Sequence, residues 1–305
     1  MATEPDVWPE HEVSACDCCG SRAWKWAFAE SGVNLGRCAE CGLYYVNPMP
    51  TREQRVEEIH DGQFREGESV CNARRHEQAS VQIEEWFRSC ADLTRRFAPP
   101  GKWLDIGCGT GTLIRIAQED GIEAEGIELT GDRLAFAREV TGAVIHGEPI
   151  EQLDLPNESF AAVVMTDVFS HLTSPMESLA RIREVLIPGG VLVIFTSEVG
   201  PGLQRHHAYT WDLGDHLVFL GEHTIERYAE KLVFDLIHRE RQWQPERVFT
   251  RERFRVKGRS ALRDFIKAVC LYTPGVFPLL RWYMLTKRHL GNPIYRSELV
   301  LKKPT

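Results

Sequence analysis

The sequence is short of long apolar stretches. No run among its 305 residues reaches the length of a membrane span, and the opening segment, MATEPDVWPEHE, lacks the apolar core of a secretory signal. We therefore expect a cytoplasmic protein without a membrane span, whose cysteines act as metal ligands or free thiols rather than as disulfides. The sequence also shows no Ser-His-Asp arrangement and no open catalytic metal site. It therefore does not indicate a hydrolase that uses a serine triad or a catalytic metal.

Basic residues are scarce outside the end of the chain. The formal net charge is -8 and the pI is near 5.8, which does not favour a nucleic-acid partner. Residues 251–305 nevertheless hold thirteen Lys or Arg against three acidic residues, a net charge of +10, which leaves -18 on the rest. This asymmetry indicates an anionic partner or acceptor, unless the basic residues only form solvated faces.

Four cysteines form two closely spaced pairs. Cys16 and Cys19 make one C-x2-C pair, Cys38 and Cys41 make another, and eighteen residues separate the pairs. This is the spacing of a four-cysteine zinc ribbon. Cys18 could replace Cys19 as a ligand, although the geometry of a zinc knuckle favours Cys19. Because four thiolates leave no open position for water or substrate, the pattern predicts a structural Zn2+ ion.

The segment KWLDIGCGTG, residues 102–111, joins an apolar strand to three glycines at alternate positions. A helical run follows, and then a second strand that ends at Glu128. This order is typical of the first βαβ unit of a doubly wound sheet, where glycines let a ligand lie against the backbone. An acidic residue after the second strand can accept hydrogen bonds from both hydroxyls of a ribose. The segment therefore predicts an α/β fold that binds a nucleoside cofactor.

Spacing favours one class of cofactor over another. The dinucleotide fingerprint needs glycine or alanine at position 112, where this sequence has Thr, and this disfavours NAD. The order Asp105-x-Gly107-x-Gly109-x-Gly111 instead resembles the class I methyltransferases, which bind S-adenosylmethionine. Two later segments, FAAVVMTDVFSHL (160–172) and LARIREVLIPGGVLVIF (179–195), resemble that family around its fourth and fifth strands.

The resemblance implies a set of cofactor contacts. The aspartate before the glycines would lie near the methionine ammonium, the glycines would pack against the amino acid and ribose, and Glu128 would hold the ribose hydroxyls. Glu148 would reach the adenine, and two residues that end the fourth strand would lie beside the cofactor. The implied cofactor-binding residues are Asp105, Gly107, Gly109, Gly111, Glu128, Glu148, Thr166 and Asp167.

A long segment, residues 197–222, follows the predicted fifth strand and is rich in His, Trp and Tyr. Its acid-His pair resembles one in zinc-containing deoxysugar C-methyltransferases, in which the histidine is implicated as the base. The resemblance implies His216 as the base, held by Asp215, with His171 as a further candidate. The alternative is that these histidines only stabilise the fold. Reserve candidates in the same segment are His206, His207 and Tyr209.

The amino-terminal module, with CGLYYVNP after its second cysteine pair, also resembles methyltransferases of secondary metabolism. Together these resemblances imply S-adenosylmethionine-dependent methylation of a hydroxyl or carbon of a sugar or secondary metabolite, either anionic or carrier-linked. A ribosomal RNA methyltransferase is an alternative, disfavoured by the acidic pI and by TDVF in place of an Asn-Pro-Pro-Tyr tetrapeptide. A catalytically silent fold-mate is another, disfavoured by the intact glycine loop. The acceptor and the oligomeric state stay open.

Composition and length allow one full α/β domain with appendages. Hydrophobic residues make up 43% of the chain and charged residues 26%, as in ordinary globular proteins. We predict a zinc-ribbon module at 1–50, a lid and connecting helix at 51–100, the cofactor-binding core at 101–258, and a helical insertion with a closing strand at 259–305. We expect the sixth strand at Val233–Arg239, and the closing strand at Ser297–Lys303 after two helices within Ser260–Leu290.

Overall fold

The computed structural model covers the ribbon and most of the predicted core. The residues it describes are 13–30, 32–60, 81–199, 213–242, 269, 272–273, 275–276, 278–279 and 294–305. Among these, no helix is long and apolar enough to cross a lipid bilayer. The predicted helical insertion lies almost wholly outside the described residues, as do the reserve candidates His206, His207 and Tyr209.

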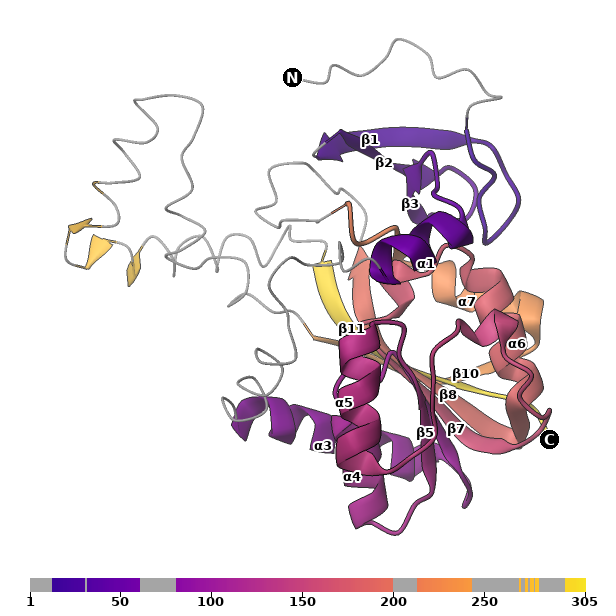
Figure 1. Cartoon of the computed structure of the whole chain (residues 1–305). Coiled ribbons are helices and arrows are strands. Elements are labelled where there is room, and N and C mark those ends of the chain that lie inside the picture. Colours follow the sequence, from indigo (N-terminus) through magenta and orange to yellow (C-terminus); the bar gives the residue numbers. More distant parts are fainter. Residues whose placement is uncertain are drawn as a thin grey trace.

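A mixed sheet forms the centre of the molecule (Figure 1). Its parallel strands follow the spatial order β6-β5-β4-β7-β8. Beyond β8, the antiparallel strand β11 (Ile294–Lys302) pairs with β8 on one side and with β10 (Asp235–Gln242) on the other. This order confirms the predicted Rossmann-like doubly wound sheet. The parallel strands are β4 (Trp103–Ile106), β5 (Ala124–Ile127), β6 (Ile145–His146), β7 (Phe160–Thr166) and β8 (Leu186–Val199).

Helices cover both faces of this sheet. One layer holds α3 (Val81–Phe97), α4 (Thr112–Glu119) and α5 (Gly131–Thr141), and the other holds α6 (Pro175–Val185) and α7 (Thr224–Leu232). Side chains of β8 alternate between the layers, as the two-residue period of a strand requires. Both sets are buried, which explains why the central strands read as continuous apolar runs in the sequence.

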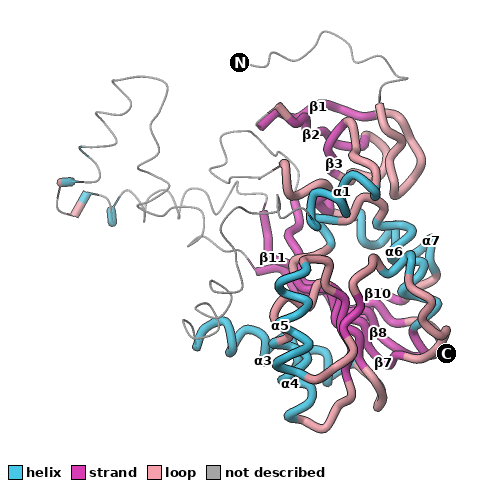
Figure 2. The backbone as a smooth tube through the Cα atoms, in the orientation of Figure 1, coloured by secondary structure: helices cyan, strands magenta, loops and turns pink. Residues whose placement is uncertain are grey.

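The amino-terminal strands extend the same sheet. Strands β1 (Trp24–Glu30), β2 (Val33–Cys38) and β3 (Tyr44–Asn47) form an antiparallel ribbon, and β3 pairs with β9 (Val218–Gly221). Strand β9 in turn pairs with the last residues of β8. The ribbon therefore lies at one end of the core sheet, next to α1 (Arg52–His60) (Figure 2), and shares its hydrophobic cluster.

The two cysteine knuckles each contact the core directly. In the second knuckle, the carbonyl oxygen of Gly42 lies so close to Gly221 that a Cβ there would approach it to 2.2 Å. Only glycine at position 221 permits this approach. The Gly221 amide also donates to Thr224 Oγ1 (2.9 Å), whose hydroxyl donates to the carbonyl of Cys41 (3.4 Å). The turn between β9 and α7 is thus built against the second knuckle.

The first knuckle contacts the core through Asp17. The carboxylate of Asp17 accepts hydrogen bonds from the Ser174 hydroxyl (2.9 Å), the Met176 amide (2.8 Å) and the Tyr228 hydroxyl (2.8 Å). Met176 lies in the first turn of α6, where an anion is favoured by the helix dipole and by amides that lack intrahelical partners. Asp17 therefore caps a helix of the core from within the ribbon.

Some predicted boundaries were wrong. Strand β10 begins at Asp235 rather than at Val233, because Val233 ends α7 in the left-handed region with φ 54. Strand β11 begins at Ile294, three residues before the predicted start, since its pairing with β8 continues to Val199.

Replacing Asp17 by alanine should destabilise the whole chain. The change leaves three donors without their acceptor, including the buried Tyr228 hydroxyl. Losing charge-assisted bonds of this kind is expected to lower the free energy of unfolding by about 2–3 kcal/mol. Urea unfolding followed by tryptophan fluorescence measures this difference.

The matched control is Asp17→Asn, which keeps one acceptor oxygen and should lose less. If the free energy of unfolding of Asp17→Ala lay within about 0.5 kcal/mol of the parental value, this would contradict the role of Asp17 as a cap.

Candidate functional site

A cavity of about 470 Å³ opens where the parallel strands end at their carboxyl edge. Ligands of open α/β sheets collect at this edge, and the volume is in the usual range for small-molecule sites. Six of the predicted site residues line it: Gly107, Glu128, Thr166, Asp167, His171 and His216.

The cavity exists because β7 stops before β8 does. The last pair between these strands is Thr166 with Phe195, and β9 begins to pair with β8 only at Glu198. Strand β11 pairs with the other edge of β8 from Val191 to Val199, so within the described residues Thr196 and Ser197 have no neighbouring strand on the cavity edge. Both line the cavity beside Thr166.

One residue of the glycine loop, Gly107, lines the cavity. Gly107 has φ 70, and a Cβ at this position would lie 2.3 Å from Val168 Cγ2. Glu128 is only 7% exposed, and its carboxylate accepts hydrogen bonds from the amides of Gly109 (2.9 Å) and Thr130 (2.8 Å). Each carboxylate oxygen can accept more than one hydrogen bond, so this arrangement still fits a ribose diol at the cavity wall.

Other predicted cofactor residues lie off the cavity wall. Asp105 is 4% exposed behind the loop, and its pKa is raised well above the ordinary value by burial and then by the charge of Glu128. Gly111 is the N-cap residue of α4. Glu148 is exposed, and the wall near it is formed by Pro149 and the two residues that follow. Contacts of these residues with a cofactor stay predictions.

Two histidines also line the cavity. His171 lies in the short 3-10 helix η3 (Phe169–His171), before the start of α6. Its ring lies 4.7 Å from that of His216, centroid to centroid, and nitrogens of both rings lie within 4.8 Å of a carboxylate oxygen of Asp215. His171 Nδ1 is 2.9 Å from the carbonyl oxygen of Asp215 and 3.6 Å from its carboxylate. The three predicted catalytic residues are therefore neighbours.

Burial controls the charge of His171. Loss of hydration lowers its pKa to about 4, and the nearby charge of His216 adds to this effect. The Asp215 carboxylate acts in the opposite direction but is also bound by Arg55 at 2.9 Å. His171 is thus a neutral imidazole at neutral pH.

Helix α1 also lines the cavity, and none of its lining residues was predicted from the sequence. Arg52, Arg55, Val56 and Ile59 follow one another at helical spacing and line the cavity from one face of the helix. The segment is so polar that it was predicted only as part of a lid region. The spacing of Val56 and Ile59 was the available signal, but a pair of apolar residues is too weak to identify a buried face.

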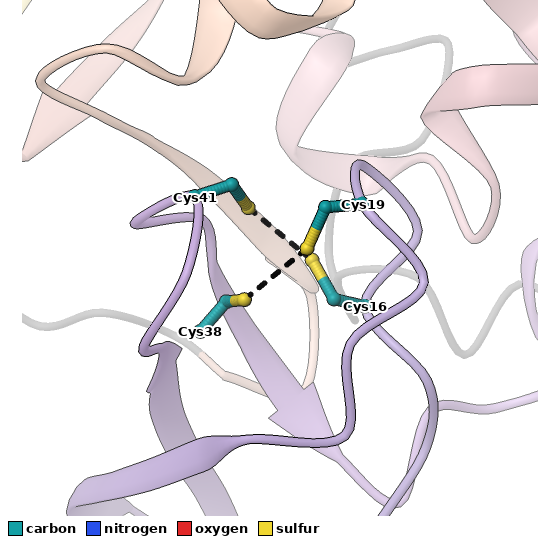
Figure 3. A group of neighbouring side chains, drawn as sticks. All are labelled: Cys16, Cys19, Cys38 and Cys41. Atoms are coloured by element: carbon teal, nitrogen blue, oxygen red, sulfur yellow. Dashed lines mark hydrogen bonds between the residues drawn. The ribbon is translucent and has the colours of Figure 1, made fainter.

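The four predicted zinc ligands come together from the two knuckles (Figure 3). Their Sγ atoms lie within 4.8 Å of one another, with 3.4 Å between Cys16 and Cys41 and 3.5 Å between Cys19 and Cys38. A tetrahedral zinc site with Zn–S bonds near 2.3 Å has sulfurs about 3.8 Å apart, so a zinc ion fits with small adjustments. Hydrogen bonds from Cys16 and then from Cys18 lower the pKa of Cys41, which favours its thiolate.

Comparison with known proteins identifies the core. A family model described as "Methyltransferase domain" matches residues 79–239, more than half of the chain. The chain belongs to the methyltransferase-domain family. The match covers the glycine loop, Glu128, the strand that bears Thr166 and the short helix η3 that bears His171, while the ribbon lies outside it.

Curated relatives of this methyltransferase-family chain include enzymes with different acceptors. It is 32% identical over 119 residues to a dTDP-3-amino-3,6-dideoxy-alpha-D-glucopyranose N,N-dimethyltransferase from Streptomyces fradiae, covering 36% of this chain and 47% of the relative. It is 31% identical over 106 residues to a ubiquinone biosynthesis O-methyltransferase from Bradyrhizobium sp. (strain ORS 278), covering 31% of this chain and 39% of the relative. The chain thus matches less than half the length of either relative.

Solved structures support the same fold. A geranyl diphosphate C-methyltransferase from Streptomyces coelicolor A3(2), in complex with Mg2+, geranyl-S-thiolodiphosphate and S-adenosyl-L-homocysteine, superposes with a TM-score of 0.56. The superposition covers 84% of this chain and 99% of that one at 11% sequence identity. At this identity the likeness concerns the fold alone.

The depressed pKa of His171 makes stability depend on pH. The folded-state pKa is about 4 against an ordinary value of 6.5, so the unfolded chain binds a proton between these values that the folded chain does not. This contribution to stability is present above pH 6.5 and is lost as the pH falls toward 4, by at most about 3 kcal/mol. Urea unfolding at pH 7, 5.5 and 4.5 should therefore show a shallower pH slope for His171→Gln than for the parent.

The control for this experiment is His223→Gln, whose side chain is 77% exposed and which should keep the parental slope. Parallel pH profiles for the parent and His171→Gln would contradict the depressed pKa.

Proposed function

We propose that this chain transfers a methyl group from S-adenosylmethionine to a small-molecule acceptor. The observation that carries the proposal is that one cavity is lined by both Gly107 and Glu128 and by His171 and His216. Membership of the methyltransferase-domain family and the methyltransferase relatives support it.

The cofactor half of the cavity is the wall formed by the glycine loop and the ends of β5 and β7. When bound, S-adenosylmethionine supplies an electrophilic methyl group on a sulfonium, together with its own leaving group. Glu128 would accept the ribose hydroxyls, and the absence of a side chain at Gly107 would let the ligand lie against the backbone. Thr166 and Asp167 would lie beside it at the strand end.

The acceptor half lies between η3, β9 and α1. Val56, Ile59 and Phe219 supply apolar surface there, and His171 and His216 supply bases for an acceptor that must lose a proton. Hydroxyls and acidic carbons are acceptors of this kind. The remaining task of the protein is to align donor and acceptor and to exclude water, for which the position of α1 along the cavity is suited.

A sugar or another secondary metabolite is the acceptor class that we favour. Relatives named above act on a dTDP-linked aminosugar and in ubiquinone biosynthesis. Arg52 and Arg133 line the cavity and could meet an anionic or carrier-linked acceptor.

The four-cysteine cluster is proposed to hold a structural Zn2+ ion. Cys16, Cys19, Cys38 and Cys41 would fill all four positions of a tetrahedral site, which leaves none for a substrate. We further propose the division of the chain given by the sequence, with the ribbon at 1–50, the lid and connecting helix at 51–100, the core at 101–258 and the insertion with its closing strand at 259–305. The pairing of β3 with β9 means that the ribbon would complete the core sheet instead of folding apart from it.

Binding of the cofactor product is the direct test of this function. S-adenosylhomocysteine and S-adenosylmethionine should raise the unfolding midpoint of the purified chain, and NAD should not. Glu128→Gln should weaken binding of S-adenosylhomocysteine by at least about tenfold in calorimetry, because it loses charge-assisted bonds to the ribose.

Glu125→Gln is the matched control, since Glu125 lies on β5, the strand that leads to Glu128, but pairs with His146 and does not line the cavity. A shift with NAD alone, or equal affinities for Glu128→Gln and Glu125→Gln, would overturn the proposal.

The metal proposal predicts stoichiometric zinc in the purified chain by plasma mass spectrometry. Cys38→Ser should lose most of the zinc and lower the unfolding midpoint, because metal binding stabilises only the folded ligand set. Cys18→Ser should retain the zinc, since Cys18 lies beside Cys41 but outside the set of four. Equal loss in both variants would show that Cys18 is a ligand after all.

A further inference from the structure

Arg55 is one of the most buried charged residues in the described part of the chain, at 5% exposure. Its guanidinium donates from Nη1 to the carbonyl of Gly214 (3.1 Å) and from Nη2 to the carbonyl of Asp215 (2.6 Å). Nη2 also contacts the Asp215 carboxylate at 2.9 Å. A planar fork that binds two successive carbonyls and a carboxylate fixes both the position and the orientation of the backbone it grips.

The segment that Arg55 binds, residues 214–217, is also hydrogen-bonded to η3 and to β3. The Leu217 amide donates to the carbonyl of Ser170 (2.7 Å), and the Val46 amide of β3 donates to the carbonyl of Leu217 (2.9 Å). Residues 214–217 are therefore fixed between α1, η3 and the ribbon. The Asp215 carbonyl can have little freedom in this arrangement.

The Asp215 carbonyl decides which nitrogen of His171 carries the proton. His171 Nδ1 lies 2.9 Å from this oxygen, and a carbonyl oxygen can only accept a hydrogen bond. Nδ1 must therefore be the protonated nitrogen of the neutral ring, which leaves the lone pair on Nε2. The same oxygen accepts from Arg55, so one atom connects the arginine to the tautomer of the histidine.

We propose that Arg55 is a positioning residue, which holds the Asp215 carbonyl so that His171 presents Nε2 as the proton acceptor of the acceptor site. The inference rests on the proposed methyl transfer for its chemical meaning. The proposal assigns the base to His171, whose orientation is set by this contact. His216 is then an adjacent residue of the cavity lining rather than the base. In the step, the O–H or C–H bond of the acceptor breaks, its electron pair stays on the acceptor, and the proton passes to Nε2 to give an imidazolium.

Charges around His171 agree with this role. Arg55 and His216 disfavour a second proton on the ring, while the Asp215 carboxylate 3.6 Å away favours it. Removing Arg55 takes away a positive charge, releases the carboxylate toward the ring and admits water. All these effects raise the pKa of His171. Loss of Arg55 should therefore both mix the tautomers and raise the titration midpoint.

The test is imidazole NMR on the full-length, zinc-loaded chain labelled with 15N-histidine. His171→Gln and His216→Gln assign the two signals. In the parent, His171 should show a protonated Nδ1 and an unprotonated Nε2 at pH 7. In Arg55→Gln, the tautomers should mix and the midpoint should rise by about one pH unit or more. Arg55→Lys keeps the charge without the fork, and should mix the tautomers with a smaller rise.

Arg52→Gln is the matched control, because Arg52 lies on the same face of α1 but pairs with Glu177 instead of with Asp215. Its His171 signals should match the parent. Unchanged His171 signals in both Arg55 variants would overturn the positioning role, as would equal changes in Arg52→Gln.

Affinity for S-adenosylhomocysteine, measured on the same samples, separates this inference from the proposed function. All variants should bind within about threefold of the parent, since Arg55 belongs to the other half of the cavity. A parent chain that does not bind this ligand would overturn the proposed function, whereas bound ligand with unchanged tautomers would overturn only the role of Arg55.

Discussion

The unequal lengths of β7 and β8 determine where this molecule can bind a ligand. A parallel strand must satisfy its backbone on both edges, yet β8 runs beyond the last residue of β7 and meets β9 only after a gap. The gap places Thr196 and Ser197 on the cavity wall and leaves the ends of β4, β5 and β7 open to it. The core alone thus provides the glycine loop and Glu128, which form the proposed cofactor half.

The proposed acceptor half of the cavity depends on contacts that residues of the ribbon and α1 make with the core. Strand β3 adds to β9, Asp17 caps α6, and the backbone of Gly42 fits against Gly221. Helix α1 follows directly and places Arg55 against the segment before β9. A structural metal in the knuckles would therefore act on the acceptor side indirectly, by holding the ribbon from which α1 extends. This gives a physical reason for a ribbon and a methyltransferase core to share one chain.

Local signals in the sequence predicted the core well. The glycine loop, Glu128 and the buried strand before Thr166 are fixed by short-range constraints, namely backbone conformation, strand period and close approach, and each occupies its predicted place. The cysteine spacing likewise predicted the ligand set that the structure brings together.

Contacts between distant segments could not be predicted in this way. Arg55 and Asp215 are 160 positions apart, and nothing in the polar sequence of α1 indicates a buried guanidinium. Asp17 lies between two cysteines, and nothing in the local sequence indicates that it caps α6. Glu148 was predicted as an adenine contact from the family pattern, but its side chain is exposed. Glu151, three residues later, lines the cavity instead, because the chain changes direction between the two residues. The most direct test of the whole account is a crystal structure of the zinc-loaded chain with S-adenosylhomocysteine. We expect the ribose hydroxyls to be bound by Glu128 and the homocysteine sulfur to face His171 across the cavity. A ligand bound elsewhere, or with its ribose away from Glu128, would contradict the proposed cofactor site.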